Sequence, residues 1–212
     1  MIQFPFIRTP KATMAENLSS IHPELINIAK AVPSFRYTRR TLPLIRLFFR
    51  LVFLLSKTHP SVRIEQYWIQ ASDTKSRIRL RLYKPRKASV PVPVLVWVHG
   101  GGYVVGNLNM SDDRLLKFVQ EVGIAIVSVD YRLAPEHPFP AALNDAYCAL
   151  KWVHDLAHVL GIDPNRIAVG GESAGGGLAA SLAQWSYDQG EVKPVFQLLI
   201  YPMLGDAWAV IV

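Results

Sequence analysis

Short apolar segments alternate with longer amphipathic segments from about residue 62 onward, and this alternation limits the possible folds more than any other feature. Four apolar runs have the length and composition of strands buried on both faces: Val94–Val98, Ile124–Val129, Ile167–Val169 and Phe196–Ile200. Helices are expected between them, at Arg114–Val122, Ala141–His158 and Ala174–Trp185. Strands that alternate with helices predict an α/β fold, with a mainly parallel sheet and helices on both faces.

Two segments ahead of this region predict a β-hairpin at one edge of the sheet. Val62–Ile69 and Arg77–Lys84 are rich in β-forming residues, and Ser72-Asp73-Thr74 supplies the turn between them. In the second segment Ile78, Leu80 and Leu82 alternate with Arg77, Arg79 and Arg81. This alternation predicts a half-exposed strand with the arginines on its polar face.

The N-terminal part of the chain is predicted to be helical and separate from the sheet. Thr13–Glu16 resembles a capping box, and a short helix is expected to begin at Pro23 and to end at Pro33. These features predict an N-terminal helical cap segment at residues 1–56, followed by a partial α/β core at residues 57–212.

Residues 42–55 are strongly apolar but contain Arg46 and Arg50, which lie one helical turn apart and share a face. Three interpretations stay open for this segment: a lid-like helix over a pocket, a helix lying in a membrane surface, and a spanning helix. This segment is too short and too charged for a helix that crosses a bilayer. The second interpretation predicts weak contact with a membrane surface through residues 42–55.

Composition excludes several classes of protein. Half of the residues are hydrophobic and 18% are charged, as in globular domains rather than disordered chains. The single Cys148 provides no disulfide framework, and the N-terminus lacks the pattern of a signal peptide, so we expect a cytoplasmic protein. The net charge of +7 could attract an anionic surface, but no nucleic-acid-binding motif accompanies it, and we expect no nucleic-acid partner.

A serine in a glycine turn is the main chemical signal. The pentapeptide Gly171-Glu172-Ser173-Ala174-Gly175 directly follows the expected strand at Ile167–Val169 and opens the expected helix. This context is typical of a nucleophile elbow, in which glycines allow the tight turn and the serine hydroxyl is raised above the sheet. The alternatives are a glycine-rich turn without chemistry and a phosphate-binding loop. The glycine spacings of phosphate-binding motifs are absent from the sequence.

A second glycine run, His99-Gly100-Gly101-Gly102, ends the expected strand Val94–Val98. Consecutive glycines let backbone N–H groups reach a ligand, as an acyl-transfer enzyme requires for its oxyanion. Gly101 and Gly102 are predicted to supply two donors, and the amide of Ala174 a third. His99 and Gly100 are predicted to hold the loop.

These motifs together resemble those of the hormone-sensitive-lipase-like family of α/β-hydrolase esterases. The resemblance covers about residues 62–203 and includes His99–Gly102, Asp130–Ala142 and Gly171–Gly176. It implies an α/β-hydrolase fold and a serine carboxylic-ester hydrolase that acts on a small-molecule ester. It also implies a helical cap, to which residues 13–56 contribute, and a reaction without a metal or an organic cofactor.

The family order is serine, then an acidic residue, then histidine. Asp188, Glu191 and Asp206 follow Ser173, but the six histidines, at positions 22, 59, 99, 137, 154 and 158, all precede it. We therefore expect a chain that is incomplete at its C-terminal end, lacks the last two strands of the sheet, and is inactive or nearly so by itself.

Two alternatives stay open: a non-catalytic small-molecule-binding protein with this fold, and one part of an enzyme that a second chain completes. The sequence leaves the acyl and alcohol specificity and the oligomeric state undetermined. Phe196–Ile200 is expected to form an open edge strand, and Ala207–Val212 is apolar and free of charge, so both segments predict aggregation.

Overall fold

The structure, a computed structural model, describes residues 21–31, 37–88 and 91–205. The predicted capping box at Thr13–Glu16 and the apolar segment Ala207–Val212 lie outside these residues. Contacts divide the chain after Thr41 into two units. The first contains η1 (Pro23–Leu25) and α2 (Ile26–Ala31), and the second contains the sheet.

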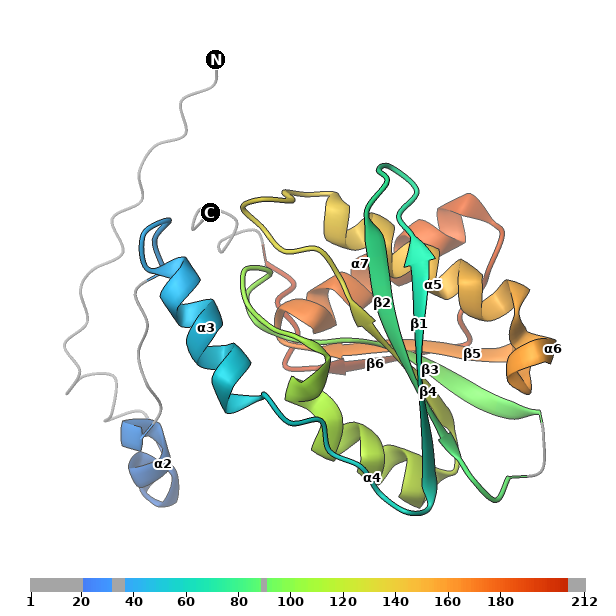
Figure 1. Cartoon of the computed structure of the whole chain (residues 1–212), viewed down its shortest axis with the longest axis horizontal. Helices are drawn as coiled ribbons and strands as arrows, with labels where there is room; N and C mark the ends of the chain where they lie inside the picture. The colour runs from blue at the N-terminus through green and yellow to red at the C-terminus, as the bar shows by residue number, and fades with distance from the viewer. Residues whose placement is uncertain (1–20, 32–36, 89–90, 206–212) are drawn as a thin grey trace. The chain divides into compact units, whose positions relative to one another are not determined.

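Six strands form one sheet in the order β1-β2-β4-β3-β5-β6 (Figure 1). They are β1 (Val62–Gln70), β2 (Arg77–Pro85), β3 (Val92–Val98), β4 (Ala125–Asp130), β5 (Ile162–Glu172) and β6 (Phe196–Ile200). β1 pairs antiparallel with β2, and β2 pairs antiparallel with β4, whereas β4, β3, β5 and β6 run parallel. The predicted mainly parallel sheet with a hairpin at its edge is confirmed.

The strand β5 is longer than the predicted segment Ile167–Val169. Its register with β3 shifts between Val92 and Val94, so the first part of β5 is irregular. The amide of Asn165 donates to Asp163 Oδ1 at 2.9 Å, a local bond typical of a turn. Because the first part of β5 is polar, the apolar pattern predicted only the later segment Ile167–Val169.

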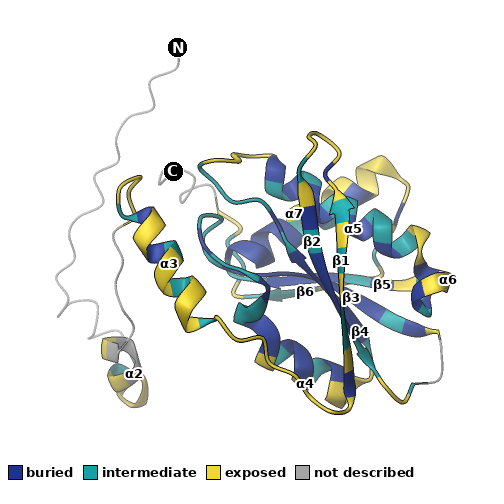
Figure 2. Cartoon of the chain, in the orientation of Figure 1, coloured by how far each residue is buried: buried dark blue, intermediate teal, exposed yellow. Residues whose placement is uncertain are grey.

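Helices cover both faces of the sheet, as the sequence predicted. α4 (Asp112–Val122) lies on one face, and α5 (Ala141–Asp155) and α7 (Ala174–Gln189) lie on the other (Figure 1). The apolar side chains between each helical layer and the sheet are the most buried of the domain (Figure 2). Parallel strands with both faces covered are expected to be largely apolar, as β3 is, and as β4 is apart from Ser128 and Asp130.

The prediction of one helix over Ala141–His158 is wrong at its C-terminal end. The helix stops at Asp155, Leu156 adopts φ −100° and ψ 12°, and a short helix α6 follows at Ala157–Leu160. Ala157 and Leu160 of this short helix are buried. The apolar pattern therefore continues beyond Asp155 although the long helix does not.

The prediction that the arginines of β2 share a polar face is wrong for Arg81. Its side chain is only 3% exposed and forms an ion pair with Asp112, the first residue of α4. Tyr83, two residues further along β2, also donates a hydrogen bond to Asp112. Because α4 covers this face and supplies a carboxylate, an arginine occupies a core position.

The apolar segment of the sequence analysis forms helix α3 (Leu42–Val52), which belongs to the same unit as the sheet. Leu42 and Ile45 are buried, but several large apolar side chains of α3 and the segment after it are exposed (Figure 2). They include Leu44, Leu47, Leu51, Val52, Leu54 and Leu55. Among the described residues, no helix is long and apolar enough to cross a membrane.

Candidate active site

Ser173 lies at the turn between β5 and α7. Its φ of 54° and ψ of −121° are unusual for a residue with a side chain, so the surrounding structure must hold this conformation. The Ser173 amide donates to the Ile200 carbonyl at 2.9 Å, and the Met203 amide donates to the Ser173 carbonyl at 3.0 Å. The backbone of the turn is therefore fixed by β6 and the loop that follows it.

The two outer glycines of the pentapeptide lie where no side chain fits. A Cβ atom on Gly171 would lie 2.3 Å from the Gly175 carbonyl oxygen, and one on Gly175 would lie 2.2 Å from the Val98 carbonyl oxygen. The first turn of α7 therefore passes directly beside the end of β3. This close approach explains both glycines in physical terms.

The glycine run after β3 passes beside the serine. A Cβ atom on Gly100 would lie 3.5 Å from the Cβ atom of Ser173. Three successive residues of this loop have positive φ: Gly101 at 118°, Gly102 at 59° and Tyr103 at 65°. The amides of Val104 and Val105 donate to the Gly101 carbonyl at 3.1 and 3.0 Å and close the loop into a turn.

Three backbone amides of the glycine run and the serine turn are the predicted oxyanion donors. Within the described part of the chain, the N–H groups of Gly101, Gly102 and Ala174 donate to no protein acceptor. Ala174 is also the first residue of α7, where the helix dipole favours negative charge. Such amides can stabilise an oxyanion that forms on a carbonyl attacked by Ser173.

His99 lies inside the glycine loop. Its side chain is fully buried, its Nδ1 lies 2.7 Å from the Gly100 carbonyl oxygen, and its ring stacks on Tyr131 with centroids 4.3 Å apart. The Tyr131 hydroxyl donates to the His99 carbonyl at 3.0 Å. Burial lowers the pKa of His99, so the imidazole is neutral near pH 7.

Glu172 connects three segments that the sequence analysis did not associate. Its carboxylate accepts hydrogen bonds from Ser111 Oγ at 2.8 Å and from the Tyr201 hydroxyl at 2.8 Å, and it pairs with Arg114. Ser111 ends the 3-10 helix η2 (Leu108–Ser111) that directly precedes α4, Arg114 lies in the first turn of α4, and Tyr201 directly follows β6. No local sequence pattern indicated Ser111, Arg114 or Tyr201, because only the fold brings them together.

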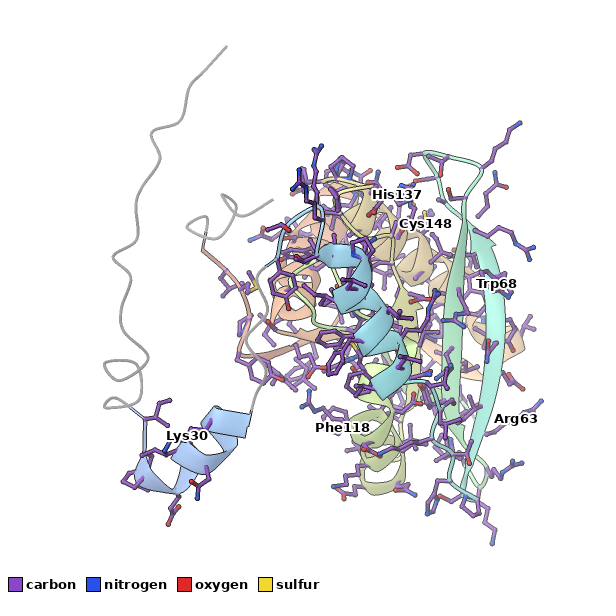
Figure 3. All side chains as sticks on the ribbon, turned by 60° about the vertical axis from the view of Figure 1, so that its left-hand side comes forward. Lys30, Arg63, Trp68, Phe118, His137 and Cys148 are labelled. Atoms are coloured by element: carbon purple, nitrogen blue, oxygen red, sulfur yellow. The ribbon has the colours of Figure 1, made fainter. Side chains whose placement is uncertain are left out.

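The described residues hold no histidine in hydrogen-bond contact with Ser173. His59 contacts Ser61, and His154 contacts Asp155. His137 is exposed in the loop before α5 (Figure 3). Of the acidic residues that follow Ser173, Glu191 pairs with Lys151, and Asp206 lies outside the described residues.

A family model described as the alpha/beta hydrolase fold matches residues 95–210 of the sequence. The chain belongs to this family. Relatives named as esterases place this α/β-hydrolase in the hormone-sensitive-lipase-like branch that the motifs indicated. The recognition made from the sequence is therefore confirmed.

Two relatives come from Mycobacterium tuberculosis. Carboxylesterase NlhH is 45% identical over 143 residues, which cover 68% of this α/β-hydrolase and 44% of the relative. Esterase LipI is 37% identical over 200 residues, which cover 89% of this chain and 58% of LipI. The chain thus spans about half the length of the curated relatives that it matches.

Solved structures agree with this assignment. A structure named Bacterial Heroin Esterase superposes with a TM-score of 0.83 at 37% sequence identity. The superposition covers 90% of this α/β-hydrolase and 60% of the esterase.

Proposed function

We propose that this chain carries the nucleophile and the oxyanion hole of a serine carboxylic-ester hydrolase. Ser173 Oγ attacks the ester carbonyl, and the amides of Gly101, Gly102 and Ala174 stabilise the oxyanion. The carbonyl then re-forms as the alcohol leaves, and water hydrolyses the acyl-enzyme to acid and free serine. The observation that supports the proposal is that the glycine run passes beside the strained serine turn at Gly100 and contains amides without an acceptor among the described residues.

The reaction also needs a base that takes the Ser173 proton and returns it to the leaving alcohol. The six histidines all precede Ser173 in the sequence, and none contacts it within the described residues. We therefore expect near-background turnover of esters by this chain alone. Binding and the oxyanion hole by themselves give about 10³–10⁴-fold acceleration over water.

Labelling with a fluorophosphonate tests the nucleophile without requiring turnover. Ser173 Oγ attacks phosphorus and fluoride leaves, while added imidazole accepts the proton in place of the histidine. We expect mass spectrometry to locate one imidazole-dependent adduct on Ser173, and none in Ser173→Ala. If Ser173 of the folded chain stays unlabelled with imidazole present, the proposal is wrong. Rapid ester hydrolysis without imidazole would disprove the absence of a base.

Short acyl esters are the proposed substrate class. A relative named Ethyl acetate hydrolase, from Pseudomonas putida, is 42% identical over 127 residues, and Arylacetamide deacetylase from Oryctolagus cuniculus is 40% identical over 138 residues. Both names indicate an acetyl group. Labelling should therefore be slowed more by p-nitrophenyl acetate than by the palmitate ester at equal concentration. The proposed mechanism requires no metal or organic cofactor, because a serine, backbone amides and a general base are sufficient for it.

We also propose weak contact between α3 and a membrane surface. The exposed side chains of Leu44, Leu47 and Leu51, with the exposed Arg50 among them, fit an anionic lipid surface. Co-sedimentation with phosphatidylglycerol vesicles should exceed that with phosphatidylcholine vesicles and should decrease in Leu47→Ser. If the parent chain and Leu47→Ser sedimented equally with phosphatidylglycerol vesicles, the proposal would be contradicted. The single Cys148 suits a cytoplasmic location, which stays a prediction.

A further inference from the structure

One arginine joins α3 to the core at three places. Arg46 Nε donates to the Val104 carbonyl at 2.8 Å, and Nη2 donates to the Ala134 carbonyl at 2.7 Å. The same guanidinium forms two parallel bonds with Glu136, at 2.9 and 2.8 Å. A planar guanidinium can satisfy these acceptors together, which a lysine ammonium cannot do with the same geometry.

The Val104 carbonyl belongs to the glycine loop. The amide of Val104 donates to the Gly101 carbonyl at 3.1 Å, so Arg46 binds the same turn that orients Gly101. The loop has positive φ at three successive residues, including Tyr103. Backbone in such conformations persists only where its surroundings hold it, and Arg46 is a contact that reaches this loop from α3.

The contacts of Arg46 form a closed ring. The Ala134 amide donates to the Tyr103 carbonyl at 3.0 Å, and the Ala134 carbonyl in turn accepts from Arg46. Residues 103–104, Ala134 and Arg46 therefore restrain one another. Glu136 completes the attachment, and its hydrogen bond from Arg46 lowers the pKa of that carboxyl.

Other contacts of α3 lie nearer to its two ends. Leu42 and Ile45 are its buried apolar residues, and at its C-terminal end Asn109 Nδ2 donates to the Phe53 carbonyl at 2.7 Å. A hollow of about 820 Å³ lies between α3 and the core, with Arg46, Arg50 and Asp130 among its lining residues. Arg50 has no ion-pair partner within the described residues, although it lies one turn from Arg46.

We infer that Arg46 is a positioning residue that couples α3 to the glycine loop. With α3 in place, Arg46 stabilises the loop conformation that presents the amides of Gly101 and Gly102. Arg46 acts through the Val104 and Ala134 carbonyls rather than by contact with substrate. The inference rests on the proposed function, because that function assigns these amides to the oxyanion.

Hydrogen exchange tests the coupling directly in the full chain. In Arg46→Met, we expect amides of α3 and of residues 101–106 to exchange about tenfold faster, equivalent to about 1.4 kcal/mol of local opening. Arg50→Met removes the same charge from the same face and should leave both segments unchanged. The inference is wrong if the two variants behave alike, or if residues 101–106 keep their parent rates in Arg46→Met.

Glu136→Gln is a control for a general folding defect. It removes the ion pair of Arg46 but keeps the bonds of Arg46 to the Val104 and Ala134 carbonyls. We expect faster exchange in α3 of less than tenfold, with residues 101–106 unchanged. An effect on residues 101–106 as large as that of Arg46→Met would show that the ion pair, not the loop contact, carries the coupling, and would overturn the inference.

A second measurement separates this inference from the proposed function. Imidazole-dependent fluorophosphonate labelling of Ser173 should slow about tenfold in Arg46→Met and not in Arg50→Met, because the phosphonyl oxygen requires the same amides. Failure of the parent chain to react would overturn the proposed function alone, because hydrogen exchange still reports on the coupling. Labelling of Arg46→Met at the parent rate would contradict the positioning role.

Discussion

The Arg81 guanidinium and the Asp112 carboxylate form an ion pair at 3.0 Å in which both side chains are almost completely buried. Asp112 also accepts a hydrogen bond from the backbone amide of Lys57 at 2.8 Å and one from Tyr83. A single carboxylate therefore joins β2, the start of α4 and the segment between α3 and β1. Because this buried carboxylate has three contacting groups, we expect its removal to cost much stability.

Asp112→Ala should lower the free energy of unfolding by about 3–5 kcal/mol, because Arg81 would be left buried without a counter-ion. Urea unfolding followed by circular dichroism measures the change. Asp113→Ala is the matched control, since Asp113 is exposed and pairs with the exposed Lys57 side chain. The control should change stability by no more than about 1 kcal/mol. Similar losses in both variants would show that Asp112 has no special structural role.

Gly171→Ala should destabilise the domain by at least about 3 kcal/mol, at the upper end of overpacking effects, because the new Cβ atom would meet the Gly175 carbonyl. Gly190→Ala is the control, because Gly190 has φ 70° but no atom within 4 Å of an added Cβ. Its expected loss is about 1–2 kcal/mol, from backbone strain alone. Thermal denaturation compares the two variants, and equal losses would contradict the proposed steric cause.

His99 predicts a specific dependence of stability on pH. Burial lowers its pKa below the ordinary value of 6.5, so the unfolded chain binds a proton more readily than the folded chain. Stability should therefore decrease as pH falls below about 6.5, with a contribution from this group of up to about 1.4 kcal/mol per pH unit. His99→Gln should remove that contribution in urea unfolding at pH 7.5, 6.5 and 5.5. His158→Gln, at an exposed position, is the control, and an equal effect there would exclude burial of His99 as the cause.

Ser111→Ala should lower the free energy of unfolding by about 1.5–3 kcal/mol, because the buried Ser111 hydroxyl donates to the charged Glu172 carboxylate. Ser181→Ala is the control, since that exposed hydroxyl only bonds the Gly177 carbonyl one turn earlier in α7. The control should be neutral or slightly stabilising. Chemical denaturation measures both, and a neutral Ser111→Ala would show that this hydroxyl does not hold Glu172.

The order of strands and helices, the serine turn and the glycine loop were predictable because their signals are local. Hydrophobic periodicity depends on neighbouring residues, and a strand-to-helix turn requires glycine on both sides of Ser173 wherever the turn is located. The two failures in secondary structure have local causes as well. Asp163 and Asn165 give the start of β5 the appearance of a turn, and helix periodicity continues through Leu156 although the helix itself does not.

The α/β-hydrolase family, the serine and the loop glycines follow from local sequence, since each is specified within a few residues of chain. The partners of the charged groups follow from the tertiary structure instead. Arg81 meets Asp112 at a separation of 31 residues, Arg114 meets Glu172 at 58, and Arg46 meets Glu136 at 90. Arg46 and Arg50 look equivalent on one helical face, yet only Arg46 lies where the glycine loop and Ala134 present their carbonyls. Such pairings depend on which elements the sheet topology brings together, and no local pattern encodes that.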